Sequence, residues 1–319
     1  MTGLRSPEPW LRALGSRRIQ YVLVAAAILG AIIGLDTLVL HLTVDPLADV
    51  RAYYDAGARL NSGLPLYEQL ATTDDPAFYR YPPLLAVLFR PLAVLPFETA
   101  ALIWEAVLVV AFIATVLLIG VRRRWTWLLL GWLAAPICWA LAIGQAHVLV
   151  TLFLTIGTPL GVALAANLKL LPILVAVFWA ARRDGRALLR LAGWMVALAL
   201  IQFALEPAGT IAFLTFTDLG QVGDVINLSP FVVSPFLWVA VVVVLAVVAW
   251  RTASTRFGWG AVVVLAVFAT PRLLMYQLSS LLAVARPDAV YTAPDASATV
   301  DDARPAGLSG GDVDRAGSR

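Results

Sequence analysis

The sequence is poor in charged residues, which occupy 13% of its 319 positions, whereas hydrophobic residues occupy 61%. Soluble domains carry about a quarter charged residues, so this composition excludes an ordinary soluble globular protein. The single cysteine, Cys138, excludes an internal disulfide, and its apolar neighbours predict a buried, unreactive thiol. His41 and His147 are the only histidines, which excludes a zinc site built from a Cys/His cluster, and we expect His147 to be a packed side chain.

Long apolar segments dominate the chain instead. The first, Ile19–Leu42, exceeds the roughly 20 residues of a spanning helix and is too long for a cleaved signal, so we expect an uncleaved anchor. Together the segments predict an all-α, polytopic transmembrane bundle of about eight to ten membrane segments. The later segments are Ala100–Val121, Trp125–Ile143, His147–Leu164, Leu168–Ala181, Ala187–Leu205, Ser234–Trp250, Trp259–Ala269 and Leu273–Ala285.

Arginines between these segments indicate the orientation in a cell membrane. Lys and Arg collect on the cytoplasmic side, and here they form three clusters, at 122–124, 182–186 and 251–256. Placing these clusters and the basic N-terminus (1–18) inside leaves 43–80 and 206–233 outside. Residues 19–285 then form the membrane domain, and 286–319, which have almost no large apolar side chains, form a disordered cytoplasmic tail.

Two regions do not read as simple crossings. Tyr81–Pro96 contains four prolines and is better interpreted as a juxtamembrane or half-inserted helix. Gly144–Ala181 is broken at Gly157 and Pro159, so one crossing with a hairpin or three short helices would both fit. Because irregular backbone at membrane depth is tolerated where it lines a cavity, these breaks predict a cavity.

The first outer loop carries an amphipathic pattern. Tyr53, Ala56 and Leu60 share one face, which predicts a helix lying on the membrane that Gly63 is placed to end. Asp49 begins this helix, where a carboxylate caps backbone amides as readily as it serves catalysis. On the residues alone, both roles remain open.

The spacing of Asp49, Tyr53, Tyr54, Ala56, Gly63, Pro65 and Tyr67 resembles the first-loop pattern of glycosyltransferase family 87. The resemblance extends over roughly residues 45–285, through Tyr81–Leu84, Phe89–Leu92, Gly144–Gln145, Lys169–Pro172 and, weakly, Asn227–Ser229. Members of this family are GT-C class mannosyltransferases that depend on polyprenyl-phosphate mannose. The resemblance implies a GT-C-like bundle that transfers a hexose, expected to be mannose, to a glycolipid or cell-wall glycan outside the membrane.

Such a transfer needs a general base for the acceptor hydroxyl and a cation for the departing phosphate. One carboxylate suffices for a direct inverting displacement, unlike the pair used in glycoside hydrolysis. We predict Asp49 as the base, matching the family's loop aspartate, with Asp45 and Asp55 as less suitable candidates.

The predicted ligands of the donor phosphate are Lys169, Arg272 and Arg90. Lys169 interrupts an apolar stretch, where a lysine normally faces a partner or cavity, although a snorkelling lysine at a helix end would look the same. The predicted substrate-binding residues are Tyr53, Tyr67, Tyr81, Gln145 and Tyr276.

The alternative is a polytopic transporter or lipid-linked sugar flippase. Transporters commonly show two related halves with paired broken helices, and none is evident here. No glycine-rich phosphate loop supports a nucleotide site, so we expect no cofactor, with a divalent metal left open. The expected partners are the lipid-linked donor, the glycan acceptor and membrane lipids, but not nucleic acid. Gly30 and Gly34 form a small-residue packing motif in the first helix.

Overall fold

The computed structural model describes residues 16–68, 78–215 and 227–286, which belong to one unit, Met1–Pro287. Within these ranges every regular element is a helix, which confirms the all-α prediction. The predictions for the extreme N-terminus, for residues 69–77 and 216–226 of the outer loops, and for the tail beyond residue 286 lie outside the described residues. The domain boundaries stay predictions.

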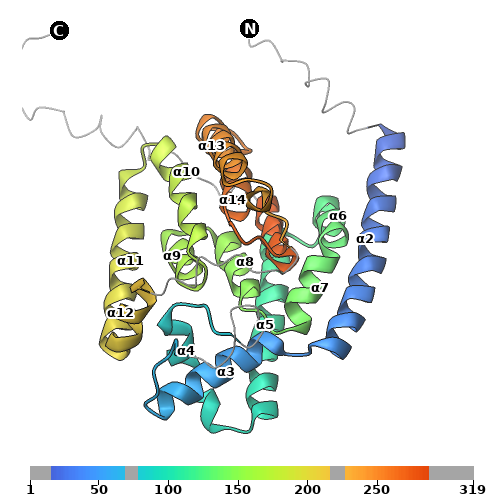
Figure 1. Cartoon of the computed structure of the whole chain (residues 1–319). Coiled ribbons are helices and arrows are strands. Elements are labelled where there is room, and N and C mark those ends of the chain that lie inside the picture. Colours follow the sequence, from blue (N-terminus) through green and yellow to red (C-terminus); the bar gives the residue numbers. More distant parts are fainter. Residues whose placement is uncertain (1–15, 69–77, 216–226, 287–319) are drawn as a thin grey trace, which may run out of the picture. The chain divides into compact units, whose positions relative to one another are not determined.

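Four helices in the described ranges are long and apolar enough to cross a membrane, which confirms a polytopic bundle (Figure 1). The segment predicted at Trp125–Ile143 is a fifth candidate, but it is split into two helices that meet at 64°. The four are α2 (Arg17–Val44), α5 (Phe97–Ile119), α11 (Gly185–Leu205) and α13 (Pro235–Thr252), and the bent pair is α6 (Arg124–Trp132) and α7 (Ala134–Ala142).

The remaining predicted membrane segments are shorter than a full crossing. Gly157, with φ of +60°, ends one helix, Pro159 begins the next, and Lys169 ends that one, so Gly144–Ala181 forms several short helices. The segment at Leu273–Ala285 is mostly a 3₁₀-helix, with Gln277, Ser279 and Ser280 buried. The elements in these segments are α8 (His147–Ile156), α9 (Pro159–Leu168), η2 (Leu171–Val175), α10 (Ala176–Ala181), α14 (Gly258–Phe268) and η5 (Met275–Ala285). Within the predicted outer loop 206–233 lie α12 (Pro207–Thr215) and η4 (Pro230–Val232).

The first helix is held by small residues. A Cβ on Gly34 would lie 2.5 Å from the Cβ of Ala134 on α7, and one on Gly30 would overlap the carbonyl oxygen of Gly131 on α6. The two glycines therefore do form a close helix contact, as small residues do between membrane helices. Cys138, on α7, is half-buried rather than buried.

The amphipathic helix of the first loop is α3 (Ala48–Asn61), and Tyr53, Ala56 and Leu60 are buried as predicted. Gly63, with φ of +67°, follows its end. The half-inserted helix is α4 (Pro83–Phe89), followed by η1 (Leu92–Val94). Both α3 and α4 lie at the end of the bundle away from the start of α2 (Figure 1).

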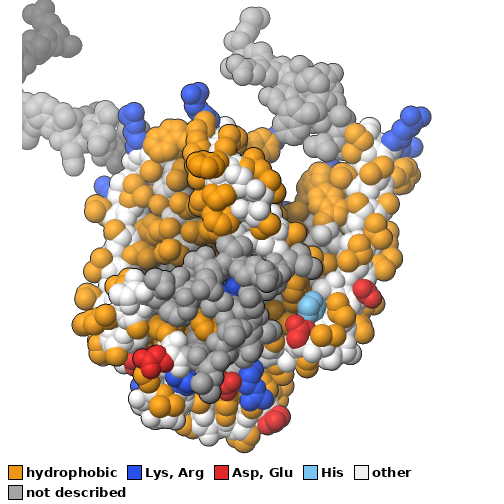
Figure 2. Space-filling view, viewed as in Figure 1, with side chains coloured by type: hydrophobic (Ala, Val, Ile, Leu, Met, Phe, Trp, Pro, Cys, Tyr) orange, Lys and Arg blue, Asp and Glu red, His pale blue; other side chains and the backbone are white. Residues whose placement is uncertain are grey.

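Charge is distributed unevenly between the two ends of the bundle. In Figure 2, basic side chains project from the end where α2 begins, and the visible acidic side chains lie in the half toward α3 and α12, together with further basic side chains. The end where α2 begins is thus basic, in agreement with the positive-inside pattern of the sequence.

We predict that Gly34→Ala lowers the thermal unfolding midpoint in detergent micelles, because overpacking a close contact costs about 1–3 kcal/mol. Gly193→Ala is the matched control, since a Cβ there, also within a long helix, meets nothing within 4 Å. Equal midpoints for the two variants would contradict the close approach of α2 to α7.

Candidate active site

Asp49 is positioned by backbone contacts between α3 and the end of α7. The amide of Leu47 donates to the carbonyl of Ala142 and that of Asp49 to the carbonyl of Ile143, both at 3.1 Å. Leu47 adopts a left-handed conformation, with φ of +57°, and its side chain makes no cap. Non-glycine residues take up this strain only where their surroundings impose it. The N-cap residue of α3 is Leu47, and the carboxylate of Asp49 is contacted by the hydroxyl of Tyr53 rather than serving as the cap.

The turn between α7 and α8 requires glycine at position 144. Its φ is +69°, and a Cβ would overlap Val50 and lie 2.7 Å from Oε1 of Glu105. The indole of Trp104 donates to the carbonyl of Gly144 at 2.8 Å. The turn thus brings the next residue, Gln145, into contact with Tyr53 of α3.

A buried cluster of hydroxyl groups lies beside Asp49. The hydroxyl of Tyr53 is 2.8 Å from Oε1 of Gln145, 3.0 Å from the hydroxyl of Tyr81 and 3.4 Å from Oδ1 of Asp49. It also accepts the amide of Ala146 at 3.2 Å, and Tyr81 donates to Gln145 at 2.5 Å. Three residues that are distant in the sequence and were each predicted as substrate ligands therefore form one network.

Lys169, the chain's only lysine, reaches this cluster from the break between α9 and η2. Its ammonium nitrogen lies 4.4 Å from the ring centroid of Tyr81 and 3.5 Å from the hydroxyl of Tyr276. The side chain is only partly exposed. A snorkelling lysine would direct its ammonium away from such partners, so the contacts favour a residue that faces a site.

Two arginines, Arg272 and Arg80, act electrostatically on Lys169. The charges of Arg272 and Arg80 both lower the pKa of Lys169, which shows that the three side chains are close in electrostatic terms. The backbone on both sides of Arg272 is held by Asn227, whose side chain donates to the carbonyl of Pro271 at 2.9 Å and accepts the amide of Leu273 at 2.8 Å. Within the described part of the chain, buried Nε and Nη1 of Arg272 have no hydrogen-bond partner.

The carboxylate and the ammonium shift each other's titration. Burial raises the pKa of Asp49 to about 6, and Lys169 and Tyr53 limit that rise by favouring the charged form. Burial lowers the pKa of Lys169 to about 8, while the charge of Asp49 opposes that fall. The amide nitrogen of Gln145 has no partner at bonding distance among the described residues, yet it approaches Asp49 closely enough to favour the carboxylate.

A cavity of about 100 Å³ adjoins Lys169. One part of its lining is polar, with His147, Gln277 and Ser280, and the rest is apolar. Nε2 of His147 lies 2.8 Å from the hydroxyl oxygen of Ser280 and 3.1 Å from the carbonyl oxygen of Gln277. His147 is therefore packed. The cavity lies beside the break after α9, and the breaks at Gly157 and Pro159, from which a cavity was predicted, are not among its lining residues.

The other predicted site residues lie around this centre or apart from it. The hydroxyl of Tyr67 donates to the carbonyl of Tyr81 at 2.7 Å, so Tyr67 supports the cluster from the backbone side. Arg90 is exposed and donates from Nε to Asn61 at 3.0 Å, in a pair separate from the Lys169 contacts. Asp55 is exposed on the opposite face of α3 from Tyr53.

The side of the site toward α2 includes Trp139, which sequence reasoning missed, and Asp45, which was named only as a less suitable base. Asp45 pairs with His41 at 2.7 Å, and the ring of His41 stacks on Trp139 with centroids 4.4 Å apart. Trp139 in turn meets the ring of Tyr276 edge-on at 5.9 Å. The negative charge of Asp45 also contributes to the raised pKa of Asp49. The i, i+4 spacing of His41 and Asp45 was the available signal for this pair.

Chemically, the site combines one carboxylate of raised pKa with three cations and a set of neutral hydroxyl and amide groups. A carboxylate with a pKa near neutrality can accept a proton from a hydroxyl group. Among the described residues, Nε and Nη1 of Arg272 are buried without a hydrogen-bond partner, which suits an anion such as a phosphate. The predicted absence of a cofactor is not tested by this arrangement.

Residues 78–286 match the family described as glycosyltransferase family 87, a range that contains Tyr81, Gln145, Lys169 and Arg272 and begins after α3. Two curated relatives share the name polyprenol-phosphate-mannose-dependent alpha-(1-2)-phosphatidylinositol pentamannoside mannosyltransferase. The one from Mycobacterium tuberculosis is 31% identical over 203 residues, covering 56% of this chain and 46% of the relative. The one from Mycolicibacterium smegmatis is 27% identical over 201 residues, covering 57% and 48%.

This chain thus spans about half the length of the curated relatives it matches. No solved structure matches it.

We predict that Lys169 reacts with an amine-modifying reagent with a midpoint near pH 8, because only the neutral amine reacts and its pKa is lowered to about 8. Asp49→Asn should move this midpoint to lower pH, since it removes a charge that favours the ammonium, whereas Asp55→Asn should not. Peptide mass spectrometry reports the modification at a single site because the chain has one lysine. Identical midpoints in all three proteins would show that Asp49 and Lys169 are not coupled.

Proposed function

The chain belongs to glycosyltransferase family 87, and from that membership we propose that it transfers mannose from a polyprenyl-phosphate donor to a glycolipid or cell-wall glycan. The names of its two curated relatives support both the donor and a mannosylated glycolipid as the acceptor class. The several apolar helices agree with an enzyme that meets lipid-linked substrates within a membrane. The acceptor linkage is left open.

One observation carries the proposal: the carboxylate of Asp49 and the ammonium of Lys169 shift each other's pKa beside a cluster of hydroxyl groups. Arg272 acts on the same ammonium, and its Nε and Nη1 have no hydrogen-bond partner among the described residues. A sugar phosphate presents a carbon that is attacked and a phosphate that departs with negative charge. The site offers a base for the first event and cations for the second.

In the proposed reaction, an acceptor hydroxyl gives its proton to Asp49 while its oxygen forms a bond to the anomeric carbon of mannose. The bond from that carbon to the phosphate oxygen breaks, and the electron pair leaves with the phosphate. Lys169 and Arg272 stabilise the developing charge, with Arg80 nearby. Because attack and departure occur on opposite faces, the configuration at the anomeric carbon inverts.

The neutral groups of the site suit the sugar. Tyr53, Tyr81 and Gln145 provide hydroxyl and amide groups within hydrogen-bond reach of one another, next to the proposed base. Tyr276, in contact with Lys169, borders the phosphate. The apolar lining of the cavity beside Lys169, with Leu170, Leu171 and Pro172, suits the start of the lipid tail.

We propose that the site faces the outside of the cell membrane. The support is the arginine distribution of the sequence and the position of α3 at the end of the bundle away from the start of α2 (Figure 1). A lipid-linked sugar exposed at the outer surface would then meet Asp49 from the aqueous side. Membership of a glycosyltransferase family favours an enzyme over a transporter or a lipid-linked sugar flippase.

Asp49→Asn should fold like the parent yet transfer mannose at least about 100-fold more slowly, because loss of a general base costs about 10²–10⁴ in rate. The matched control is Asp55→Asn, on the exposed face of the same helix, which should stay within about tenfold. The assay supplies polyprenyl-phosphate mannose and membrane extract and measures the glycosylated product. Near-parental turnover by folded Asp49→Asn would remove Asp49 from the reaction.

Orientation has its own test. In a Cys138→Ala background, a cysteine introduced as Ser62→Cys, at the exposed end of α3, should react with an impermeant thiol reagent on intact cells. A cysteine in the arginine-rich turn, introduced as Arg183→Cys, should react only after lysis. The reverse pattern would put the site on the cytoplasmic face.

A further inference from the structure

A second cavity, of about 620 Å³, lies between α2 and α6 and shares no residue with the candidate active site. Its wall on α2 runs from Gln20 to Ala31 along one helical face, about 16 Å at 1.5 Å per residue. Ala31 is in turn roughly 20 Å along the axis from the end of α2, where the chain turns into α3. The cavity therefore lies near the other end of the bundle from Asp49.

The shape of the cavity follows from the way the two helices pack. At Gly30 and Gly131 the backbones touch, because neither residue has a side chain to hold them apart. Toward the start of α2 the facing residues are larger and the helices separate, with Trp132 donating to the carbonyl of Leu23 at 3.0 Å across the gap. The result is a groove that is closed at the glycine contact and open at the end where α2 begins.

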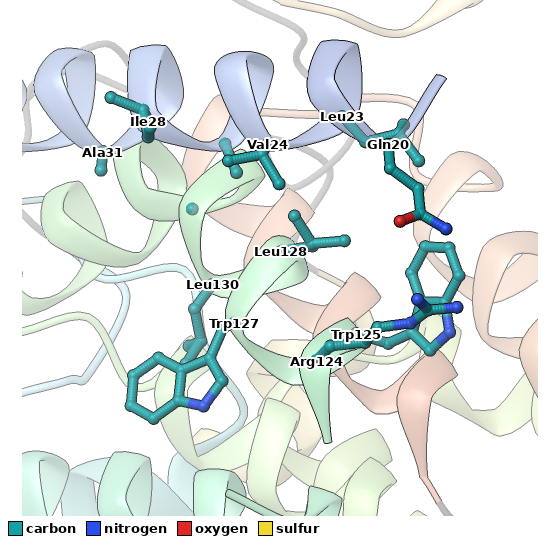
Figure 3. Close-up of a pocket in the computed structure, with 12 residues that line it drawn as sticks. Gln20, Leu23, Val24, Ile28, Ala31, Arg124, Trp125, Trp127, Leu128 and Leu130 are labelled. Atoms are coloured by element: carbon teal, nitrogen blue, oxygen red, sulfur yellow. The ribbon is translucent and has the colours of Figure 1, made fainter. Parts of the chain in front are cut away.

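The lining is apolar along its length and polar at one end. Figure 3 shows Val24 of α2 beside Leu128 of α6, whereas Gln20 lies close to Arg124 and Trp125; Ile28 and Ala31 lie farther along α2. Val24, Ile28 and Trp127 are exposed in the isolated chain, so the groove opens to the hydrocarbon that surrounds the bundle. An elongated apolar groove that opens sideways into a bilayer suits a lipid chain better than a compact soluble ligand.

The positive charge of Arg124 at the open end of the groove favours lipids with an anionic headgroup. Arg124 is exposed at the start of α6, directly after Arg122 and Arg123, and its guanidinium lies 5.3 Å from the ring centroid of Trp125. Among the described residues that line the groove there is no Asp or Glu to neutralise this charge. Basic pockets between membrane helices on the cytoplasmic side bind anionic headgroups, and tryptophans occupy the same interface.

We propose that this groove binds one anionic glycerophospholipid of the cytoplasmic leaflet, with the headgroup phosphate at Arg124 and an acyl chain between α2 and α6. The lipid is distinct from the sugar donor, whose phosphate would bind Lys169 near the opposite end. Because the lipid fills the space where α2 and α6 separate, it stabilises the packing of α2, the helix that leads into α3, against α6. A ligand that binds only the folded state raises its stability.

The test is native mass spectrometry of the full chain in detergent, titrated separately with phosphatidylglycerol and phosphatidylcholine. The parent should retain one phosphatidylglycerol more strongly than phosphatidylcholine, and Arg124→Gln should weaken that retention about fivefold, the effect of one basic residue at a membrane surface. Arg251→Gln is the matched control, since Arg251 is an exposed arginine at the end of α13 and does not line the groove. It should leave retention unchanged.

A second variant addresses the acyl chain. Ala31→Phe places a ring in the narrow end of the groove and should reduce retention of both lipids without touching Arg124. Equal retention of the two lipids by the parent would indicate ordinary surrounding lipid and overturn the proposal. So would unchanged phosphatidylglycerol retention in both Arg124→Gln and Ala31→Phe, or a parent that is dimeric with the groove covered by a second copy.

Discussion

The site depends on holding the carboxylate of Asp49 and the ammonium of Lys169 close together where both are largely removed from water. A carboxylate and an ammonium each lose hydration there, and the losses shift the pKa of Asp49 upward and that of Lys169 downward. Each charge partly offsets the loss of the other, as opposite charges do in a medium of low polarity. Removing one partner would therefore change the titration of the other. Burial thus brings both pKa values toward neutrality, and the charge of each partner limits that shift.

Most of the surrounding structure serves to bring these residues together from distant parts of the chain. The strained turn at Leu47 docks α3 onto the carbonyls that end α7, and Gly144 allows Gln145 to approach Tyr53. The break after α9 frees Lys169 from a regular helix, and Asn227 fixes the segment that carries Arg272. Short, interrupted helices are therefore part of the site, since continuous spans would leave no place for these side chains.

The sequence predicts the four long spanning helices, the amphipathic α3 and its end at Gly63 closely, because apolar length and helical period are local properties. It overestimates the number of full crossings, since several other apolar segments form shorter helices. Asp49, Tyr53, Tyr81, Gln145, Lys169 and Tyr276 could be proposed from the family resemblance, and the structure brings them together. Arg80 and Trp139 could not, since their contacts join segments far apart in the chain. The bend between α6 and α7 and the 3₁₀ geometry of η5 also arise from tertiary packing, which an apolar run does not encode.

The central claim is that Asp49 acts as a base while Lys169 binds phosphate as a cation. It is tested most directly by the dependence of kcat/KM on pH, measured with polyprenyl-phosphate mannose below saturation. We expect a bell-shaped profile, in which kcat/KM rises through about pH 6 as Asp49 loses its proton and falls through about pH 8 as Lys169 loses its proton. A profile that stays flat across that interval, or that keeps rising beyond it, would contradict the assignment of these two residues.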